Sequence, residues 1–284
     1  MKQKFYKYQG AGNDFLIADN RDGSIVLTSG QIASLCDRRY GVGADGLMLL
    51  DAPAAGEDAD FRMTYYNSDG SGGMMCGNGG RCIVAFAADM GLRGFRFIAA
   101  DGYHQASLLS DDGRVKMVRL QMKDVCSFKR YDGLTGVSVP SDGYFLDTGT
   151  RHYVRIAEGL DSYDIVSEGR DIRYNAVELQ PAGANVNFIE PCRCGMLKVR
   201  TYEKGVEDET FACGTGIVAS CMTAFISGIA PSEILSDGRV KYDVKAKKDR
   251  LAVEFVPSSD GCCLASDVYL TGPAAFVAEI ILPL

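Results

Sequence analysis

The sequence predicts an α+β protein with two pseudo-symmetric domains, each a curved, mostly antiparallel sheet or barrel wrapped around a central helix. The first reason is a repeated motif, because Cys76-Gly-Asn-Gly and Cys213-Gly-Thr-Gly each open an apolar run. The second is that these motifs lie almost half the chain apart, which indicates two half-molecules. The third is that most remaining segments have the length and alternation of short strands between glycine turns. This pattern favours a sheet around a buried helix over a βαβ array.

In the first half, a helix is expected at 29–38 and a second from Cys82 to Met90, closed by Gly91. Residues 76–80 should therefore lie at or just before the start of the second helix. Alternating or apolar segments bounded by turns predict strands at 3–9, 15–19, 47–50, 61–66, 94–100, 104–110, 114–122 and 125–130.

In the second half, the apolar run 217–226 predicts a helix that follows the Cys213 turn, and another helix is expected at 161–170. Strands are expected at 143–148, 152–157, 185–190, 195–202, 240–245, 250–256 and 262–271. The apolar run 275–284 should return to the first half. The expected domains are therefore 1–119 plus 274–284, which carries Cys76, and 120–273, which carries Cys213.

Composition narrows the function classes. A net charge of −7 and the absence of a basic run exclude a nucleic-acid surface. No segment reaches 18 apolar residues and the N-terminus has no signal-peptide pattern, so a cytoplasmic protein without a membrane span is expected. The ten cysteines are expected to be thiols. The pairs Cys192-x-Cys194 and Cys262-Cys263 lack zinc-site spacing, so no metal is expected.

Two thiols at helix N-termini indicate a specific chemistry. The unpaired N–H groups and the positive dipole end stabilise a thiolate and can receive a carboxylate. Cys76 and Cys213 on opposite sides of an interdomain cleft could remove a proton from one face of a carbon and return one to the other face, which is racemisation or epimerisation. The N–H groups of Gly77-Asn78 and Gly214-Thr215 would stabilise the enediolate that forms.

Asparagines beside glycine turns are candidate ligand contacts, and they are Asn13, Asn67 and Asn185. The segments 10–15 and 183–188 also resemble each other, which adds a second repeat to that of the cysteine turns. Of the two histidines, His104 follows a predicted hairpin turn and is expected at the surface.

Six motifs together resemble the diaminopimelate epimerase family over nearly the whole chain. They are Gly10-Ala-Gly-Asn-Asp-Phe, Tyr40-Gly-Val-Gly-Ala-Asp-Gly, Tyr66-Asn-Ser-Asp-Gly, Met75-Cys-Gly-Asn-Gly-Gly-Arg-Cys, Ala184-Asn-Val-Asn-Phe and Tyr202-Glu-Lys-Gly-Val-Glu-Asp-Glu-Thr-Phe-Ala-Cys-Gly-Thr-Gly. The resemblance implies a cofactor-independent enzyme that interconverts LL- and meso-diaminopimelate in the lysine and cell-wall pathway. It leaves the oligomeric state open, including a homodimer.

The resemblance also implies roles for individual residues. Cys76 and Cys213 are the catalytic pair, and His152 and Glu203 adjust their pKa. Lys204, Thr150, Arg151 and Gly46 stand where the family often has arginine, asparagine, proline and glutamine. A sister racemase acting on another amino acid therefore stays open. The implied substrate contacts are Asn13, Asn67, Gly77, Asn78, Thr150, Asn185, Glu203, Lys204, Gly214 and Thr215.

Two readings from other classes fit less well. A cysteine hydrolase or transferase would pair Cys76 with a histidine and form an acyl intermediate, which does not explain why the cysteine turn is duplicated. A redox module would use Cys76 and Cys213 as a dithiol. If the two thiols face each other, their oxidation to a disulfide should inactivate the protein reversibly.

Overall fold

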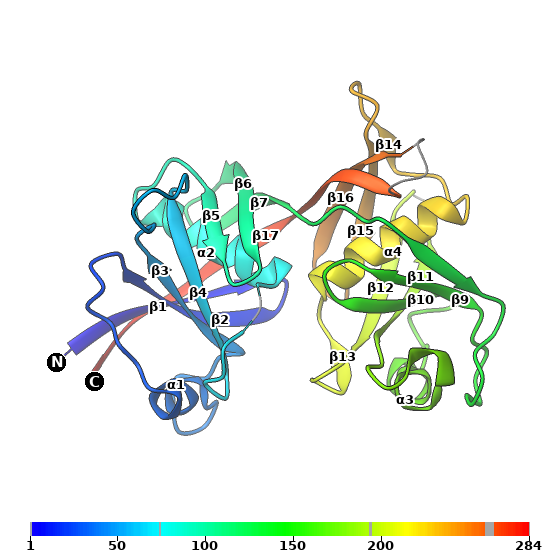
Figure 1. Ribbon diagram of the computed structural model, residues 1–284, viewed down its shortest axis with the longest axis horizontal. Coiled ribbons are helices and arrows are strands. Elements are labelled where there is room, and N and C mark those ends of the chain that lie inside the picture. Colours follow the sequence, from blue (N-terminus) through cyan, green and yellow to red (C-terminus); the bar gives the residue numbers. More distant parts are fainter. Residues whose placement is uncertain (1, 74, 193–194, 259–263, 284) are drawn as a thin grey trace. The chain divides into compact units, whose positions relative to one another are not determined.

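The computed structural model describes residues 2–73, 75–192, 195–258 and 264–283 (Figure 1). The chain divides into two compact units. Unit 1 contains Met1–Gln121 and Thr271–Leu284, and unit 2 contains Met122–Leu270. Both units combine helices with mostly antiparallel strands, so the predicted α+β class is confirmed. Three of the cysteines considered as metal ligands, Cys194, Cys262 and Cys263, lie outside the described residues.

The strands of unit 1 form a closed barrel. Each strand pairs with the next from β1 to β7, β7 pairs with β17, and β17 pairs with β1. Figure 1 shows the two chain ends side by side as a result, which confirms that the last apolar run returns to the first half. The strands are β1 (Lys2–Gly10), β2 (Asn13–Asn20), β3 (Gly46–Asp51), β4 (Phe61–Asn67), β5 (Arg96–Ala99), β6 (Gly102–Asp111), β7 (Val115–Gln121) and β17 (Ala265–Pro283).

Helix α2 (Gly77–Asp89) is the centre of this barrel and contacts β1, β2, β3, β6 and β7. It is buried from Gly77 to Ala87, as expected for a helix whose faces are nearly all small or apolar. Gly91, with φ of 86°, follows its C-terminus and closes it, as the sequence predicts. The shorter helix α1 (Ser29–Cys36) begins with a capping box formed by Thr28 and Gln31.

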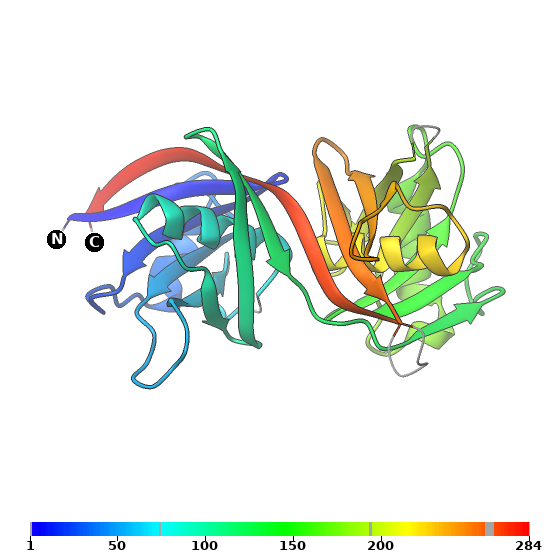
Figure 2. The same ribbon diagram turned by 90° about the horizontal axis from the view of Figure 1, so that it is seen from above.

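Unit 2 is built around helix α4 (Gly214–Ile226), which contacts β9, β10, β11, β12 and β16 (Figure 2). Gly228, with φ of 77°, follows its end, as Gly91 follows α2. The strands pair in the order β8, β9, β10, β11, β12, β15, β16, with β13 beside β12 and β14 beside β15. They are β8 (Phe128–Tyr131), β9 (Gly143–Asp147), β10 (Arg151–Ile156), β11 (Asn185–Pro191), β12 (Leu197–Glu203), β13 (Asp208–Thr210), β14 (Glu233–Ile234), β15 (Val240–Lys245) and β16 (Arg250–Pro257).

The helix expected at 161–170 begins and ends later than predicted. Helix α3 spans Ile165–Asn175 because Asp164 is its N-cap and accepts a hydrogen bond from the Ser167 N–H. A single-turn helix, Val177–Leu179, follows it. The short strands β13 and β14 have no signal in the sequence, since two or three residues show no periodicity.

Parallel strand pairs occur where the sequence suggested a mostly antiparallel sheet. In unit 1, α1 connects the parallel pair β2–β3 and α2 connects β4–β5. In unit 2, α3 connects β10–β11 and α4 connects β12–β15. Each of these helices is therefore a crossover within an otherwise antiparallel ladder, and the same order of connections recurs in both units. None of the helices in the described ranges is long and apolar enough to span a membrane.

Candidate active site

Cys76 is the N-cap residue of α2. Its backbone is extended, with φ of −117° and ψ of 153°, and its Sγ accepts a hydrogen bond of 3.3 Å from the Gly79 N–H. A helix start offers unpaired N–H groups and a positive dipole end. The predicted position of Cys76 at the start of a helix is confirmed, and this position favours its thiolate.

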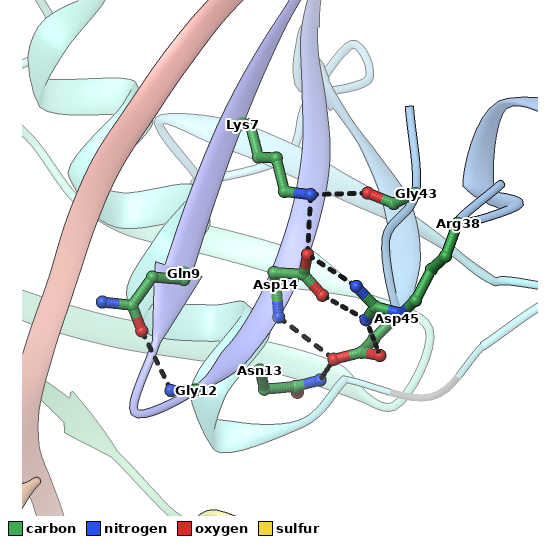
Figure 3. Close-up of polar contacts among 8 residues, drawn as sticks. All are labelled: Lys7, Gln9, Gly12, Asn13, Asp14, Arg38, Gly43 and Asp45. Atoms are coloured by element: carbon green, nitrogen blue, oxygen red, sulfur yellow. Dashed lines mark hydrogen bonds and ion pairs between the residues drawn. The ribbon is translucent and has the colours of Figure 1, made fainter. Parts of the chain in front are cut away.

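The carboxylate of Asp45 orients the side-chain amide of Asn13 (Figure 3). The Asn13 Nδ2 donates a hydrogen bond of 2.5 Å to Asp45 Oδ2. This leaves the Asn13 Oδ1, an acceptor, 4.0 Å from Cys76 Sγ. Asp45 in turn accepts from Arg38 Nη2 at 2.6 Å and from the Asp14 N–H at 3.1 Å. The amide orientation of Asn13 is thus set by Asp45, which belongs to the motif that begins at Tyr40 but had no role predicted from the sequence.

Asp14, the residue after Asn13 on β2, belongs to the same network (Figure 3). Its carboxylate pairs with Lys7 Nζ at 2.8 Å and with Arg38 Nη2 at 2.6 Å. Burial alone would raise the pKa of the Asp14 carboxyl, but hydrogen bonds from Arg38 and Lys7 outweigh it and lower that pKa. Asp14 therefore stays ionised and keeps Arg38 in place beside Asp45.

Tyr65 occupies the space that a side chain at position 46 would need. A Cβ atom on Gly46 would lie 2.4 Å from the Tyr65 ring, and one on Gly73 would lie 2.3 Å from it. A glutamine therefore does not fit at position 46 while Tyr65 holds this place. Asn67, two residues along β4 from Tyr65, donates from Nδ2 to Ser71 Oγ at 3.0 Å within its own turn.

A buried arginine supports the first turn of α2. Arg81 has no exposed surface, and its guanidinium donates to the Gly77 carbonyl at 3.1 Å and to Asn78 Oδ1 at 2.8 Å. Its Nε also lies 3.5 Å from the carbonyl of Pro273 on the returning strand β17. Arg81 thus holds the two residues whose N–H groups were predicted to bind a carboxylate.

Cys213 is the N-cap residue of α4 and is 8% exposed. Its Sγ lies 3.5 Å from Thr215 Oγ1 rather than accepting a capping bond from the helix. The Thr215 carbonyl accepts a 3.0 Å hydrogen bond from Thr148 Oγ1, which fixes the backbone of this turn. Both predicted cysteines therefore begin a central helix, but different groups contact their sulfur atoms.

His152 is fully buried beside the Cys213 turn. Its Nε2 lies 2.8 Å from Thr150 Oγ1 and 3.0 Å from Thr215 Oγ1. Its Nδ1 lies 3.0 Å from the Nδ2 of Asn187. Burial lowers the pKa of His152 to about 3, so the ring is neutral at physiological pH.

This burial predicts a dependence of stability on pH. Below the unfolded pKa of about 6.5 the unfolded chain binds a proton at position 152 that the folded protein excludes, so stability falls as pH decreases towards 3. Between pH 7 and pH 5 this histidine should remove about 2 kcal/mol from the free energy of unfolding. Urea unfolding of the wild type and of His152→Gln at both pH values checks this. An equal loss in the two proteins would show that His152 is not the group responsible.

Asn185 forms hydrogen bonds with the backbone of two residues, Arg151 and Lys204, that differ from the pattern implied by the family resemblance. Its Nδ2 donates to the Arg151 carbonyl at 3.1 Å, and its Oδ1 accepts from the Lys204 N–H at 2.9 Å. The Lys204 side chain is exposed. Glu203, at the end of β12, accepts a 2.7 Å hydrogen bond from Thr210 Oγ1. Asn185 therefore holds the backbone at both positions that carry an unusual cation.

The sequence reasoning missed Asn187 and Thr201. Asn187 is fully buried between His152 and Thr201, whose Oγ1 donates to its Oδ1 at 2.9 Å. Because alternate strand residues share a face, Asn187 lies on the same face of β11 as Asn185. That two-residue spacing was the signal that could have identified it.

The similar segments 10–15 and 183–188 do not occupy equivalent positions in the two units. Asn13 begins β2, the first strand of a parallel pair, whereas Asn185 begins β11, the second strand of its pair. By strand order, the counterpart of Asn13 lies at the start of β10, beside Thr150. The similar letters arise because glycine and asparagine serve two different connections, a hairpin turn at Ala11-Gly12 and the approach to β11.

His104 is buried rather than exposed, which corrects the expectation from the sequence. It is 6% exposed, stacks on Phe97 and lies 2.9 Å from Asp101 Oδ1. Its strand turns this side chain inwards, so a position after a hairpin turn did not decide its burial. No disulfide joins the described cysteines, and no group of side chains able to hold a metal ion occurs in the described ranges.

Comparison with known proteins decides the family. Residues 5–123 match the family model described as diaminopimelate epimerase. A diaminopimelate epimerase of Chlorobaculum tepidum is 43% identical over 272 residues, which cover 94% of this chain and 96% of that protein. The chain belongs to the diaminopimelate epimerase family. A diaminopimelate epimerase of Flavobacterium psychrophilum is also 39% identical over 279 residues, covering 97% and 98% of the two chains.

Solved structures of other proteins share the fold of this diaminopimelate epimerase family member. A PhzF-family phenazine biosynthesis protein of Bacillus anthracis aligns with a TM-score of 0.72 and 15% identity, over 100% of both chains. A probable proline racemase of Agrobacterium radiobacter aligns with a TM-score of 0.68 and 16% identity, over 99% of this chain and 93% of that one. At such low identity these likenesses show the fold alone.

Proposed function

We propose that this protein is an isomerase that epimerises LL-diaminopimelate to meso-diaminopimelate without a cofactor. The observation that carries the proposal is the pair of N-cap cysteines, Cys76 on α2 and Cys213 on α4, in a chain of this family. The recurring order of connections in the two units supports a pseudo-symmetric origin of the pair. In the cytoplasm, reducing conditions would keep both thiols available.

In the proposed reaction, one cysteine starts as thiolate and the other as thiol. The thiolate takes the α-proton, and the thiol gives its proton to the opposite face of the same carbon. The two sulfur atoms exchange protonation states in each turnover, so no net proton is gained or lost. This mechanism requires both sulfur atoms to reach the same α-carbon.

The reacting carboxylate needs stabilisation as the enediolate forms. The N–H groups of Gly77-Asn78 and of Gly214-Thr215, at the starts of two helices, suit this task. Each such donor is worth about 10²–10³-fold in rate. The support that Arg81 gives to Gly77 and Asn78 keeps the first pair in position.

The other predicted residues divide by what they can offer to a ligand. Asn13 presents a carbonyl oxygen beside Cys76, and Asn67 lies at the end of β4. Asn185 acts through the backbone of Arg151 and Lys204, since its amide already bonds both. We assign recognition of the distal amino-acid group to Lys204, Thr150 and Arg151, and a further substrate contact to Glu203. His152 and Glu203 would adjust the pKa of the two thiols.

An exposed lysine at position 204 keeps a second substrate under consideration. An ammonium lacks the planar fork with which arginine grips a carboxylate, so a sister amino-acid racemase is the alternative. The protein could also form a homodimer. The proposed reaction does not depend on the oligomeric state, which sedimentation measures.

Proton NMR in deuterium oxide tests the substrate. We expect the reduced protein to exchange the α-proton of LL-diaminopimelate and to leave the α-protons of histidine, glutamate, lysine and proline unchanged. Exchange on another amino acid alone would move the protein to the sister activity. Exchange on none of them would overturn the assignment of acid–base chemistry to this chain.

A further inference from the structure

We infer that Asn187 is a positioning residue that sets the tautomer of His152, so that the hydroxyls of Thr150 and Thr215 deliver a hydrogen bond to Cys213. This inference rests on the proposed function, because it explains how one of the two thiols becomes the base. It concerns a chain of hydrogen bonds inside unit 2, from β11 through β10 to the start of α4.

The orientation of the Asn187 amide follows from its neighbours. One end of the amide lies 3.3 Å from the Tyr153 carbonyl, and the other lies 2.9 Å from Thr201 Oγ1. A carbonyl oxygen can only accept, so the amide nitrogen must face Tyr153. The same nitrogen lies 3.0 Å from His152 Nδ1. Asn187 is therefore a donor to Nδ1, and Nδ1 carries no proton.

The unprotonated Nδ1 of His152 determines the protonation of the other ring nitrogen, Nε2. A neutral imidazole whose Nδ1 accepts must carry its proton on Nε2. Nε2 lies within hydrogen-bond distance of both threonine hydroxyls, at 2.8 Å from Thr150 and 3.0 Å from Thr215. The His152 Nε2–H therefore donates a hydrogen bond to one of these hydroxyl oxygens, which acts as the acceptor.

The hydroxyl hydrogens then point onwards to the sulfur. Thr150 Oγ1 and Thr215 Oγ1 are 2.9 Å apart, and Thr215 Oγ1 is 3.5 Å from Cys213 Sγ. With His152 donating to Thr150, Thr150 can donate to Thr215, and Thr215 can donate to Cys213. A hydrogen bond donated to sulfur favours thiolate over thiol. The chain of donors thus prepares Cys213 as the base.

Close packing leaves this network little freedom. Asn187 and His152 have no exposed surface, and Thr201 is 3% exposed. A Cβ atom on Gly216, in the first turn of α4, would lie 2.4 Å from Asn187 Oδ1 and 3.2 Å from His152 Cε1. Only glycine allows the helix start to approach Asn187 this closely. The contact couples the position of the Cys213 helix to the orientation of the asparagine.

The first test needs no variant of the network. The chain has two histidines, so nitrogen-15 NMR of protein labelled at histidine, compared with His104→Gln, assigns the ring of His152. We expect a protonated Nε2 and an unprotonated Nδ1 at neutral pH. A proton on Nδ1, or a doubly protonated ring, would overturn the inference whatever the activity of the protein.

The second test removes the donor or breaks the hydroxyl chain. Asn187→Leu should abolish the single tautomer and lower kcat on diaminopimelate about 10²-fold with little change in KM, because Asn187 orients the ring and does not touch substrate. Thr215→Val should lower kcat similarly, and Thr215→Ser, which restores a hydroxyl, should recover at least about tenfold. A serine variant as slow as the valine variant would exclude the hydroxyl chain.

Two controls separate the possible failures. If Asn187→Leu does not fold, Thr201→Val removes the hydroxyl that holds Asn187 Oδ1, and it should loosen the tautomer preference while leaving the backbone pairing of β11 and β12 intact. If the wild type does not act on diaminopimelate, the proposed function fails and the NMR result still decides the tautomer. If the wild type is active and Asn187→Leu equals it in kcat, the inference alone fails.

Discussion

Replacing Cys76 by alanine is expected to lower the rate of epimerisation by about 10³-fold or more, and replacing Cys213 should have the same effect. In the proposed mechanism, each substitution removes one of the two groups that exchange protons with the α-carbon, and a positioned acid or base contributes about 10²–10⁴-fold. The rate is measured as conversion of LL- to meso-diaminopimelate by the purified, reduced protein.

The single variants should also separate exchange from inversion. With one thiol left, the protein can still take the α-proton from the configuration facing that thiol and return a deuteron to the same face. Cys76→Ala and Cys213→Ala should therefore each exchange a different configuration at the α-carbon in deuterium oxide, and neither should invert it. A variant that still inverts the carbon at a rate near that of the wild type would exclude the two-thiol mechanism.

The same helices supply matched controls. Cys82 lies on α2 and Cys221 on α4, and both are fully buried. Burial raises the pKa of each of these thiols well above its usual range, so neither is available as thiolate. Cys82→Ala and Cys221→Ala should lower stability by about 1 kcal/mol and leave epimerisation within about threefold of the wild type.

Replacing Arg81 by methionine is expected to destabilise unit 1 by about 3 kcal/mol, since hydrogen bonds from a charged donor to Gly77 and Asn78 are lost in a buried place. The first turn of α2 should also become less ordered. Displacing the N–H groups of Gly77 and Asn78 should lower kcat/KM about 10²-fold. Urea unfolding and steady-state kinetics measure the two effects.

The comparison variants for Arg81 are Arg81→Lys and Arg93→Met. A lysine keeps the charge but cannot span the Gly77 carbonyl and Asn78 Oδ1 together, so an intermediate loss is expected. Arg93 is an exposed arginine that follows the same helix, and its replacement should change stability by less than about 0.5 kcal/mol. Equal losses for Arg81→Met and Arg93→Met would refute the role assigned to the buried guanidinium.

Much of the fold could be read from local patterns. The helices after Cys76 and Cys213 are continuous apolar runs opened by glycine turns and closed by Gly91 and Gly228, so their sequences specify both ends. The start of α3 is not specified by one local signal, because acidic and serine residues from 161 onwards offer several caps and the structure uses Asp164.

Topology was harder to predict because it depends on contacts between segments far apart in the chain. The closure of the unit 1 barrel requires β17 to lie between β1 and β7. The parallel pairs β2–β3 and β10–β11 require crossover helices to pack against the sheet. Neither feature leaves a periodic signal in any one segment.

The sequence by itself determined the two cysteine turns, the helices that they open, and the family whose motifs they share. These features are local, since a glycine turn and an apolar run are specified by adjacent residues. Only the tertiary structure decided which groups surround each sulfur atom, with Asn13, held by Asp45, near Cys76 and the His152–Asn187 network near Cys213. Hydrogen-bond partners and burial depend on residues that are far apart in the chain and that the sheet brings together. The order of residues in the chain alone does not specify which of them come into contact.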